Sequence, residues 1–365
     1  MKKMPLSDRH IKTPDNHLIK KKGIKNEIRR NILVDKRRKE NSNEDHRHIF
    51  DVAIIGAGFA GLSAALLLGR YLLPTVIFDG GKTRNFMTKQ VHGYLGLENT
   101  TPIQFIQKAW RDVLQYESIK VIKAKVGRVE REGRLFLLST KEDTRRTRRR
   151  ILVKTKHVII ATGIKDVKPK VKNFEMFDGN GAWHCPHCDG FQTTNKKLVI
   201  ISSGNNDSIK YAKEFLGWTS NIQVFLQGDN YQLTSHEISE AKKLRIKVVE
   251  NDEIIEIIGD QKKGIKGVIC RSKKFHNADV IFYHLGYNVQ NKLAEQLGCE
   301  LDDGYIKIDN QQQTTIPNVY AAGDIDTDRH YIVLAAASGT LAAMSIYEEM
   351  LKDAIGAVKK DRPKG

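Results

Sequence analysis

The sequence predicts an α/β protein of two doubly wound domains, with the second domain inserted into the first. Three features along the chain predict it. An apolar strand at residues 51–55 leads through a glycine-rich turn into an apolar helix, and a second α/β run starts at Lys197. A last strand and a long helix follow at residues 318–351. Strands and helices that alternate in this order form a parallel sheet covered on both faces, so we expect two Rossmann-like domains.

The first domain is predicted from residues 48–166 and 283–356. It opens with the strand DVAII, the turn GAGFAG, a helix at residues 62–72 and the strand TVIFD, which ends in Asp79. We then expect a helix near 102–116, strands near 119–129, 135–139 and 151–154, and a further strand closing in a glycine turn at 157–163. The strand NVYAAGDI and an Ala-rich helix at residues 331–351 complete the domain.

The second domain is predicted from residues 167–282. Its first α/β unit is KLVIISSGNNDSIKYAKEFLGW, at residues 197–218. The apolar segments NIQVFLQG, RIKVVEN and DVIFYHLGY follow as further strands. The domain also contains a C-x-x-C pair before this unit.

Gly56, Gly58 and Gly61 form a G-x-G-x-x-G motif directly between a strand and a helix. Gly56 permits the tight turn, Gly58 leaves room for a pyrophosphate, and Gly61 lets the helix pack closely on the strand. The phosphates then lie at a helix N-terminus, where free N–H groups favour negative charge. Asp79 ends the next strand, 18 residues after Gly61, at the distance expected for a ribose hydroxyl. The motif predicts a dinucleotide and does not choose between FAD and a nicotinamide nucleotide.

Positive charge is concentrated in two segments. The chain has 61 Lys and Arg against 43 Asp and Glu, and 15 of the basic residues lie in residues 1–47. A second cluster, RRTRRR, occupies residues 145–150. Because residues 1–47 lack sustained periodicity, we expect a basic, disordered extension. Polyanion contact is one interpretation of both clusters, and a solvated tail with an exposed hairpin tip is the simpler one.

The composition is typical of a soluble globular protein, at 40% hydrophobic and 28% charged residues. No apolar run reaches the roughly 18 residues that span a bilayer. No apolar segment of a signal peptide follows the basic N-terminus. We therefore expect a cytoplasmic protein without a membrane partner.

Two of the four cysteines, Cys185 and Cys188, form the C-x-x-C of CPHCDGF. His184 precedes the pair, His187 lies between the two cysteines, and Asp189 follows them. Four cysteines are too few for a disulfide scaffold, so this spacing indicates redox or metal chemistry. A free thiol of pKa near 8.5 is only about 3% ionised at pH 7, and a C-x-x-C motif that lowers it to about 7 gives roughly half thiolate. The second sulfur can then resolve a mixed disulfide made by the first.

Zinc is the alternative for this segment, since Cys185, Cys188, His184 and His187 could supply four ligands. All four lie within five residues, whereas structural zinc sites take their second ligand pair from a dozen or more residues away. The two other cysteines, Cys270 and Cys299, stand alone in the sequence. We therefore expect no metal ligands.

The order of the motifs resembles the low-molecular-weight thioredoxin reductase family. In this chain a glycine motif is followed in order by VIIATG at residues 158–163, CPHCDG, a second α/β run and TTIPNVYAAGDI at 314–325. The resemblance covers roughly residues 48–352. GGKTRNFMTKQVHGYLG at residues 80–96 and the form CPHCDGF are most similar to the branch that contains gliotoxin- and holomycin-type dithiol oxidases. The resemblance to the family implies that the cofactor is FAD and that the protein is a homodimer.

The resemblance also implies roles for single residues. Asp324 would bind the ribityl chain of FAD, and the helix after it would point its N-terminus at the flavin. Cys188 would face the flavin, Cys185 would exchange with substrate, and Asp189 would protonate the flavin-side thiolate. His184 and His187 either share this proton transfer or are exposed loop histidines. The cofactor residues implied are Gly56, Gly58, Gly61, Asp79, Arg84, Asn85, Gly163, Gly323, Asp324 and Tyr331.

The second domain departs from the family pattern for a nicotinamide nucleotide. Its glycine motif reads Gly204-Asn205-Asn206-Asp207-Ser208-Ile209, so Asn206 takes the space that a pyrophosphate needs. Ile209 replaces the small residue that allows close helix approach. The family's HRR, which holds the 2′-phosphate of NADPH, is LQG at residues 226–228. NADPH and NADH are therefore doubtful cofactors.

The sequence as a whole predicts an FAD-dependent thiol–disulfide oxidoreductase. Its partner would be a small thiol or disulfide protein or a small dithiol, and the direction of electron flow is open. An O₂-dependent dithiol oxidase of the same family is the alternative within this class. A non-catalytic flavoprotein, or a redox sensor held on polyanions by the basic extension, is the alternative outside it.

Overall fold

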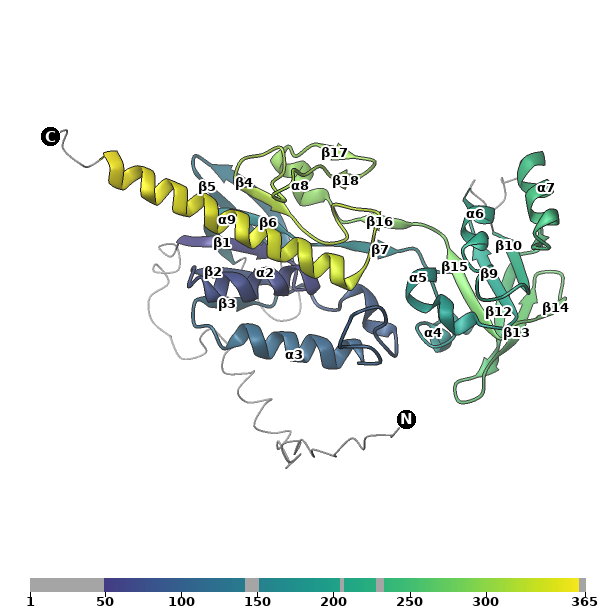
Figure 1. Cartoon of the computed structure of the whole chain (residues 1–365). Coiled ribbons are helices and arrows are strands. Elements are labelled where there is room, and N and C mark those ends of the chain that lie inside the picture. Colours follow the sequence, from purple (N-terminus) through teal and green to yellow (C-terminus); the bar gives the residue numbers. More distant parts are fainter. Residues whose placement is uncertain (1–48, 142–150, 204–206, 228–232, 361–365) are drawn as a thin grey trace, which may run out of the picture. The chain divides into compact units, whose positions relative to one another are not determined.

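The computed structural model describes residues 49–141, 151–203, 207–227 and 233–360 (Figure 1). Several predicted features lie outside the described residues. They are the extension at residues 1–47, the arginine cluster at 145–150, Gly204 to Asn206 of the second glycine motif, and Gly228. Within the described part of the chain, no helix is long and apolar enough to cross a membrane.

The first domain is built on a sheet whose strand order is β3-β2-β1-β6-β5-β4. Strand β19 (Val319–Ala321) pairs in parallel with β6, so the chain leaves this sheet after β6 and returns to it near its end. The other strands are β1 (Ile49–Ile55), β2 (Thr75–Phe78), β3 (Ile119–Ile122), β4 (Val126–Glu132), β5 (Leu135–Thr140) and β6 (Leu152–Ile160). β1, β2, β3 and β6 are parallel, and β4 and β5 form an antiparallel hairpin.

Helices cover this sheet, and α2 and α9 lie side by side (Figure 1). Gly339 of α9 lets the two backbones approach closely, because a Cβ there would lie 2.0 Å from the carbonyl oxygen of Ala60. Thr101 and Gln104 form a capping box that starts α3. The helices are α2 (Phe59–Arg70), η1 (Arg84–Met87), α3 (Pro102–Leu114), α8 (Lys292–Leu297) and α9 (Ile332–Lys360).

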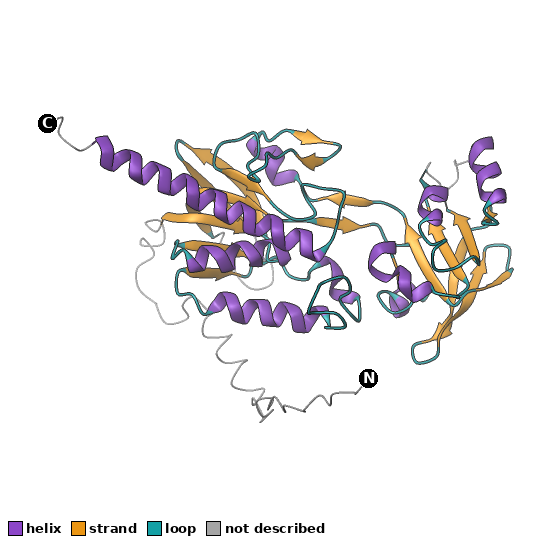
Figure 2. Cartoon of the chain, in the orientation of Figure 1, coloured by secondary structure: helices purple, strands orange, loops and turns teal. Residues whose placement is uncertain are grey.

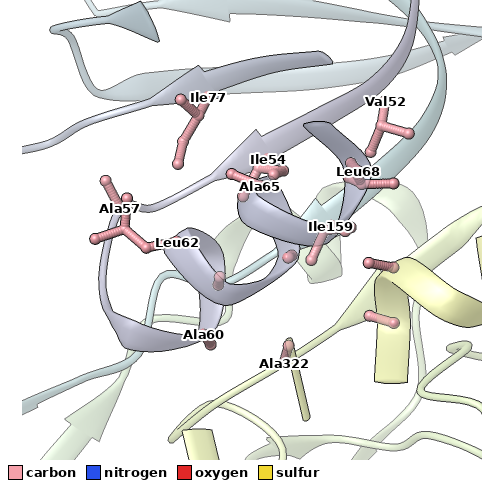
Figure 3. Packing of buried hydrophobic residues seen from close by; sticks show 14 of the residues in the cluster. Val52, Ile54, Ala57, Ala60, Leu62, Ala65, Leu68, Ile77, Ile159 and Ala322 are labelled. Carbon is pink, nitrogen blue, oxygen red and sulfur yellow. The ribbon is translucent and has the colours of Figure 1, made fainter. Parts of the chain in front are cut away.

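Buried apolar side chains from β1, β2, β6 and α2 form one core of the first domain (Figure 3). Val52 and Ile54 of β1 belong to this cluster, whereas Ala53 and Ile55 belong to a second cluster on the opposite face. This alternation follows from the two-residue period of a strand. Both faces of β1 are therefore apolar and must be covered. Helices α2, α3 and α9 contribute to the first cluster, and the β4–β5 hairpin and α8 contribute to the second.

The second domain has a parallel sheet of order β11-β10-β9-β15-β8 and an antiparallel sheet of order β12-β13-β14. Val199 and Ile201 of β9 pack toward the antiparallel sheet, and Leu198 and Ile200 pack toward α6 and α7. The strands are β8 (Ala182–Trp183), β9 (Leu198–Ser202), β10 (Ile222–Leu226), β11 (Lys247–Val249), β12 (Ile254–Asp260), β13 (Gly264–Cys270), β14 (Phe275–Asn277) and β15 (Val280–His284). The helices are α4 (Phe174–Phe177), α5 (Pro186–Asp189), η2 (Gly190–Thr193), α6 (Ser208–Lys213) and α7 (Ser235–Lys243).

Two short antiparallel pairs complete the fold (Figure 2). One joins β7 (Ile164–Asp166) to β16 (Tyr287–Val289), and the other joins β17 (Leu301–Asp302) to β18 (Tyr305–Ile306). Both chain connections between the two large sheets therefore pass through the β7–β16 pair.

Some predicted boundaries differ from the structure. The two strands expected at residues 151–154 and 157–163 are one strand, β6, which pairs with β1 on one side and β5 on the other across Thr155. The helix expected at residues 62–72 begins earlier, at Phe59. The strand expected through Tyr287 ends at His284, because the chain turns at Gly286 with φ of +84°. The domain boundary placed after residue 282 falls inside β15.

Candidate functional site

The glycine turn after β1 has the close approaches that the motif predicts. A Cβ at Gly56, whose φ is +115°, would lie 2.2 Å from the carbonyl oxygen of Ala161. A Cβ at Gly61 would lie 1.9 Å from the carbonyl oxygen of Gly56. A Cβ at Gly58 would meet no atom within 4 Å. The first and third glycines are therefore required by packing alone, and the second borders open space on the side where the motif predicts a pyrophosphate.

Residues expected to contact the rest of the cofactor lie on turns after strands, apart from Asn85 in η1. Asp79 follows β2, and its Oδ1 accepts a hydrogen bond from the N–H of Gly81 at 3.0 Å. Asn85 lies in η1, and its Oδ1 accepts from the hydroxyl of Thr83 at 3.0 Å. Gly163 and Gly323 both have positive φ, and a Cβ at Gly323 would lie 2.9 Å from the Cβ of Ala60.

Arg84 connects two acidic residues that come from distant parts of the chain. Its guanidinium pairs with Asp166 of β7 at 2.6 Å and with Asp324 at 3.2 Å. Burial opposes ionisation of Asp166, but the hydrogen bond and charge of Arg84 outweigh it, so the pKa of Asp166 lies below its usual range. In the structure Arg84 thus binds Asp324, one of the other residues expected at the cofactor, and Asp166, which the sequence analysis did not select.

Cys185 and Cys188 form a disulfide, with their Cα atoms 5.3 Å apart. Cys185 is the residue before α5, whose first helical residue is Pro186, and the backbone N–H of Cys188 donates to the Sγ of Cys185 at 3.1 Å. A donor fixed on this sulfur stabilises negative charge there once the bond opens.

Asp189 ends α5 directly after the disulfide, and only 7% of its surface is exposed. Burial raises the pKa of Asp189 to about 7, and the charge of His92 acts in the opposite direction. The carboxyl group is therefore partly protonated near neutral pH, as a proton donor to an adjacent thiolate must be. His92, which hydrogen-bonds Glu98 through Nδ1, was not among the residues selected from the sequence.

The two histidines beside the cysteines occupy different surroundings. His184 is partly buried: its Nδ1 lies 3.3 Å from the hydroxyl of Tyr283 and its Nε2 lies 3.6 Å from Asp166. Burial lowers the pKa of His184 to about 4, so it is neutral at pH 7 and the exposed-loop interpretation is wrong for it. His187 is exposed, as that interpretation expected, and its Nε2 lies 3.2 Å from Glu214.

One cavity joins several of these groups. Arg84, Asp166, His184 and Tyr283 all line it, together with residues of the segment before the disulfide. Tyr331, expected at the cofactor, has its ring centroid 5.9 Å from that of His187. The structure therefore brings the C-x-x-C segment, the predicted cofactor residues Arg84 and Tyr331, and the end of β7 into contact.

Described residues of the second domain near the predicted nicotinamide site make contacts within the domain. Gln227, at the position of the family's first arginine, donates from Nε2 to the carbonyl oxygen of Ile254 at 3.2 Å. Ile209 is 1% exposed and packs in the core beside β9 and β10. His284, at the end of β15, stacks on Tyr211 with ring centroids 4.4 Å apart. These residues support the domain and offer no cation for a 2′-phosphate.

The chain matches a known family and several curated relatives. The family described as pyridine nucleotide-disulphide oxidoreductase matches residues 50–340. A thioredoxin reductase of Listeria innocua is 27% identical over 321 residues, which cover 85% of this chain and 97% of that protein. A thioredoxin reductase of Bacillus subtilis is 26% identical, and a 34.2 kDa protein in the rubredoxin operon of Clostridium pasteurianum is 28% identical.

Solved structures give the same result at the level of the fold. A putative thioredoxin reductase TrxB of Bacillus anthracis superposes with a TM-score of 0.75 at 27% identity, covering 84% of this chain and 99% of that one. The structure of HlmI gives a TM-score of 0.77 at 24% identity, covering 86% and 96%. At that identity the likeness to HlmI shows a shared fold.

Proposed function

Because the chain belongs to the pyridine nucleotide-disulphide oxidoreductase family, we propose that its redox-active disulfide is Cys185–Cys188 and its substrate a thiol or disulfide. The protein is an FAD-dependent disulfide oxidoreductase of the thioredoxin reductase type. The observation that carries the proposal is the disulfide itself, which closes a C-x-x-C segment directly before a buried carboxyl group.

The glycine turn and the residues after β2 and β19 would hold FAD, which supplies a two-electron acceptor and donor when bound. Gly58 would leave the space for its pyrophosphate, and Asp79 would bind a ribose hydroxyl. Asp324 would take the ribityl chain while Arg84 fixes its carboxylate. Each of these contacts would position the cofactor, and none of them would move a proton.

The cysteines and Asp189 perform the thiol chemistry. When the disulfide is reduced, the Cys185 thiolate, stabilised by the N–H of Cys188, attacks a substrate disulfide and Cys188 resolves the mixed disulfide. In the opposite direction, a substrate thiolate attacks Cys185 Sγ, and Cys188 leaves as a thiolate. Asp189, with a pKa of about 7, gives its proton to the Cys188 thiolate and takes it back on the return.

Gln227 favours a second candidate within this class, the oxidation of dithiols. Its amide is hydrogen-bonded to β12, where an NADPH-dependent enzyme of the family carries an arginine for the 2′-phosphate. A charge-assisted hydrogen bond contributes on the order of 1.5–3 kcal/mol, so losing two predicts at least about a hundredfold weaker use of NADPH. A dithiol that reduces the disulfide, with oxygen as the final acceptor of the electron pair, avoids this requirement.

Anaerobic stopped-flow spectroscopy distinguishes the two directions. The oxidised protein is mixed separately with NADPH, NADH, reduced ferredoxin and a small dithiol, and flavin bleaching is followed. We expect the dithiol or the reduced carrier to act faster than NADPH, and the triple variant Asn206→Gly, Ile209→Ala, Gln227→Arg to gain nicotinamide use. Full reduction of the parent protein by micromolar NADPH within milliseconds would instead establish an NADPH-dependent disulfide reductase.

A further inference from the structure

Three potential metal ligands of the second domain lie close together, away from the disulfide. Asp252 lies between β11 and β12, Cys270 is the last residue of β13, and His276 lies in β14. A carboxylate oxygen, the Sγ and a ring nitrogen from these side chains all lie within 4.8 Å of one another. No other group of three His, Cys, Asp or Glu side chains meets in this way in the described part of the chain.

The antiparallel sheet creates this arrangement. His276 pairs with Val268 across β13 and β14, and Cys270 comes two residues after Val268, so Cys270 and His276 face the same side. Ser272, in the hairpin turn, donates from its N–H and its hydroxyl to the two oxygens of Asp252, at 2.9 and 2.6 Å. Cys270 is completely buried, and His276 is 6% exposed.

The hydrogen bonds around His276 leave one ring nitrogen ready for a ligand. Gln223 donates from Nε2 to the carbonyl oxygen of Asn277 at 3.3 Å, which turns its Oε1 toward the imidazole. Nδ1 of His276 lies 3.3 Å from this Oε1, so Nδ1 carries the proton and Nε2 of the neutral ring keeps a lone pair. Nε2 is buried and has no hydrogen-bond partner among the described residues. Metal-binding histidines are oriented in this way by a partner on their other nitrogen.

We propose that Asp252, Cys270 and His276 bind a zinc ion through a carboxylate oxygen, Sγ and Nε2, with water as the fourth ligand. Zinc takes such oxygen, sulfur and nitrogen ligands at 2.0–2.3 Å in a tetrahedron, which puts the ligand atoms roughly 3.4–3.8 Å apart. Groups that now lie within 4.8 Å of one another reach this spacing by movements of about 1 Å.

The charges favour zinc over a hard cation. Zinc uptake replaces the thiol proton of Cys270 by a Zn–S bond and releases that proton, so one thiolate and one carboxylate balance the two charges of the ion. The positive charges of Lys247 and Lys274 act on His276, so they repel any cation that is held only by electrostatic attraction to this site. Affinity therefore comes from direct bonds to sulfur and nitrogen, which calcium and magnesium do not prefer. The bound ion would tie the β11–β12 turn to the β13–β14 hairpin.

The test begins with the unmutated full-length flavoprotein, its active-site disulfide kept oxidised so that Cys185 and Cys188 offer no thiolates. After equilibration with zinc and gel filtration, we expect about one zinc per chain. X-ray absorption at the zinc edge should show one sulfur neighbour together with nitrogen and oxygen neighbours. Zinc below about one-tenth per chain, or an ion with no sulfur or with two, would overturn the proposal. This measurement does not depend on the folding of any variant.

Variants then assign the ligands. Cys270→Ser and His276→Asn should each lower bound zinc at least about tenfold while flavin content stays unchanged. Cys299→Ser is the matched control, because Cys299 is also a buried free cysteine but contacts Thr314 in the first domain. It should bind zinc like the parent. Retention of zinc by Cys270→Ser would show that the ion lies elsewhere and refute the assignment.

Discussion

At the scale of residues, the chemistry depends on the different surroundings of the two active-site cysteines. The N–H of Cys188 donates to the Sγ of Cys185, and Asp189 follows Cys188 with little exposed surface. The Sγ of Cys185 therefore has a fixed hydrogen-bond donor, and Cys188 is followed in the chain by a carboxyl group whose pKa is raised to about 7 by burial. This difference underlies the proposal that Cys185 exchanges with substrate and Cys188 exchanges electrons with the flavin.

Substituting each cysteine should separate these roles. Cys185→Ser leaves a Cys188 thiolate beside the flavin, and a long-wavelength charge-transfer absorbance is expected. Cys188→Ser should abolish electron exchange with the flavin while Cys185 stays reactive toward alkylating reagents. Absorbance spectra, alkylation followed by mass spectrometry, and disulfide turnover measure these effects. Turnover equal to the parent's in both variants would show that the active site is elsewhere.

Asp189→Asn should remove a pH dependence centred near pH 7. Because burial raises the pKa of Asp189 to about 7, the proton-donating form is present below that pH and is lost above it. Thiol exchange in the parent should therefore slow as the pH rises through 7, and in the variant it should be slow and independent of pH.

The same raised pKa contributes to the free energy of unfolding of the parent. This contribution is present in full below pH ~4 and is lost as the pH rises to about 7. Rates and unfolding midpoints from pH 5 to 9 measure both, and Asp112→Asn, at an exposed position of α3, serves as the control.

The sequence predicted the residues that carry recognisable spacing and missed those brought together only by folding. Cys185, Cys188 and Asp189 follow one another along the chain, so their association needed no tertiary information. Asp166 and His92 lie far from them in sequence, and no local pattern marks either residue. His184 and His187 look alike in the sequence, but only packing against Tyr283 separates the partly buried ring from the exposed one.

At the scale of elements, the glycine turn connects the packing of α2 on β1 with cofactor binding. Gly61→Ala places a Cβ 1.9 Å from the carbonyl oxygen of Gly56, whereas Gly58→Ala meets no protein atom within 4 Å. Gly61→Ala should therefore lower both the unfolding midpoint of the apoprotein and FAD affinity. Gly58→Ala should leave the apoprotein stability unchanged and weaken FAD binding at least about tenfold, because its methyl group enters the pyrophosphate space.

Thermal unfolding of the apoproteins and FAD titration measure the two effects separately. Equal FAD affinity in Gly58→Ala and the parent would contradict the placement of the pyrophosphate at this turn.

Element boundaries were predicted where glycine or proline marks them and missed where pairing decides them. Lys154, Thr155 and Lys156 interrupt the apolar pattern of β6, so the sequence indicated two strands. Pairing with β1 and β5 on both sides keeps them in one strand. The helix α2 starts at Phe59, within the glycine motif, since the turn needs only Gly56 and Gly58 to leave β1.

At the scale of the whole molecule, the basic extension is expected to be dispensable for chemistry. Its polar, aperiodic sequence cannot bury a core of its own. Deletion of residues 1–45 should leave flavin content and thiol turnover within about twofold and reduce salt-sensitive binding to polyanions. Replacing the arginines of residues 145–150 by glutamine in the full chain is the matched control for the second basic cluster. Loss of flavin on deletion would show that the extension is part of the fold.

We also expect a homodimer through the first domain. Helix α9 exposes several large apolar side chains: Leu334, Leu341, Met344, Leu351 and Ile355. Exposed apolar stripes of this kind mark protein interfaces. Replacing Leu341 and Ile355 by glutamate should convert the dimer to a monomer in analytical ultracentrifugation, and a monomeric parent would refute this assembly.

The central claim is that a flavin and the Cys185–Cys188 disulfide exchange electrons in one chain. Anaerobic titration with dithionite tests it directly, because FAD and a disulfide each accept one electron pair. Full reduction of the parent should consume about four electrons per chain, and that of Cys188→Ser about two. A parent protein that is fully reduced by two electrons, or one that contains no flavin and takes up none, would contradict the claim.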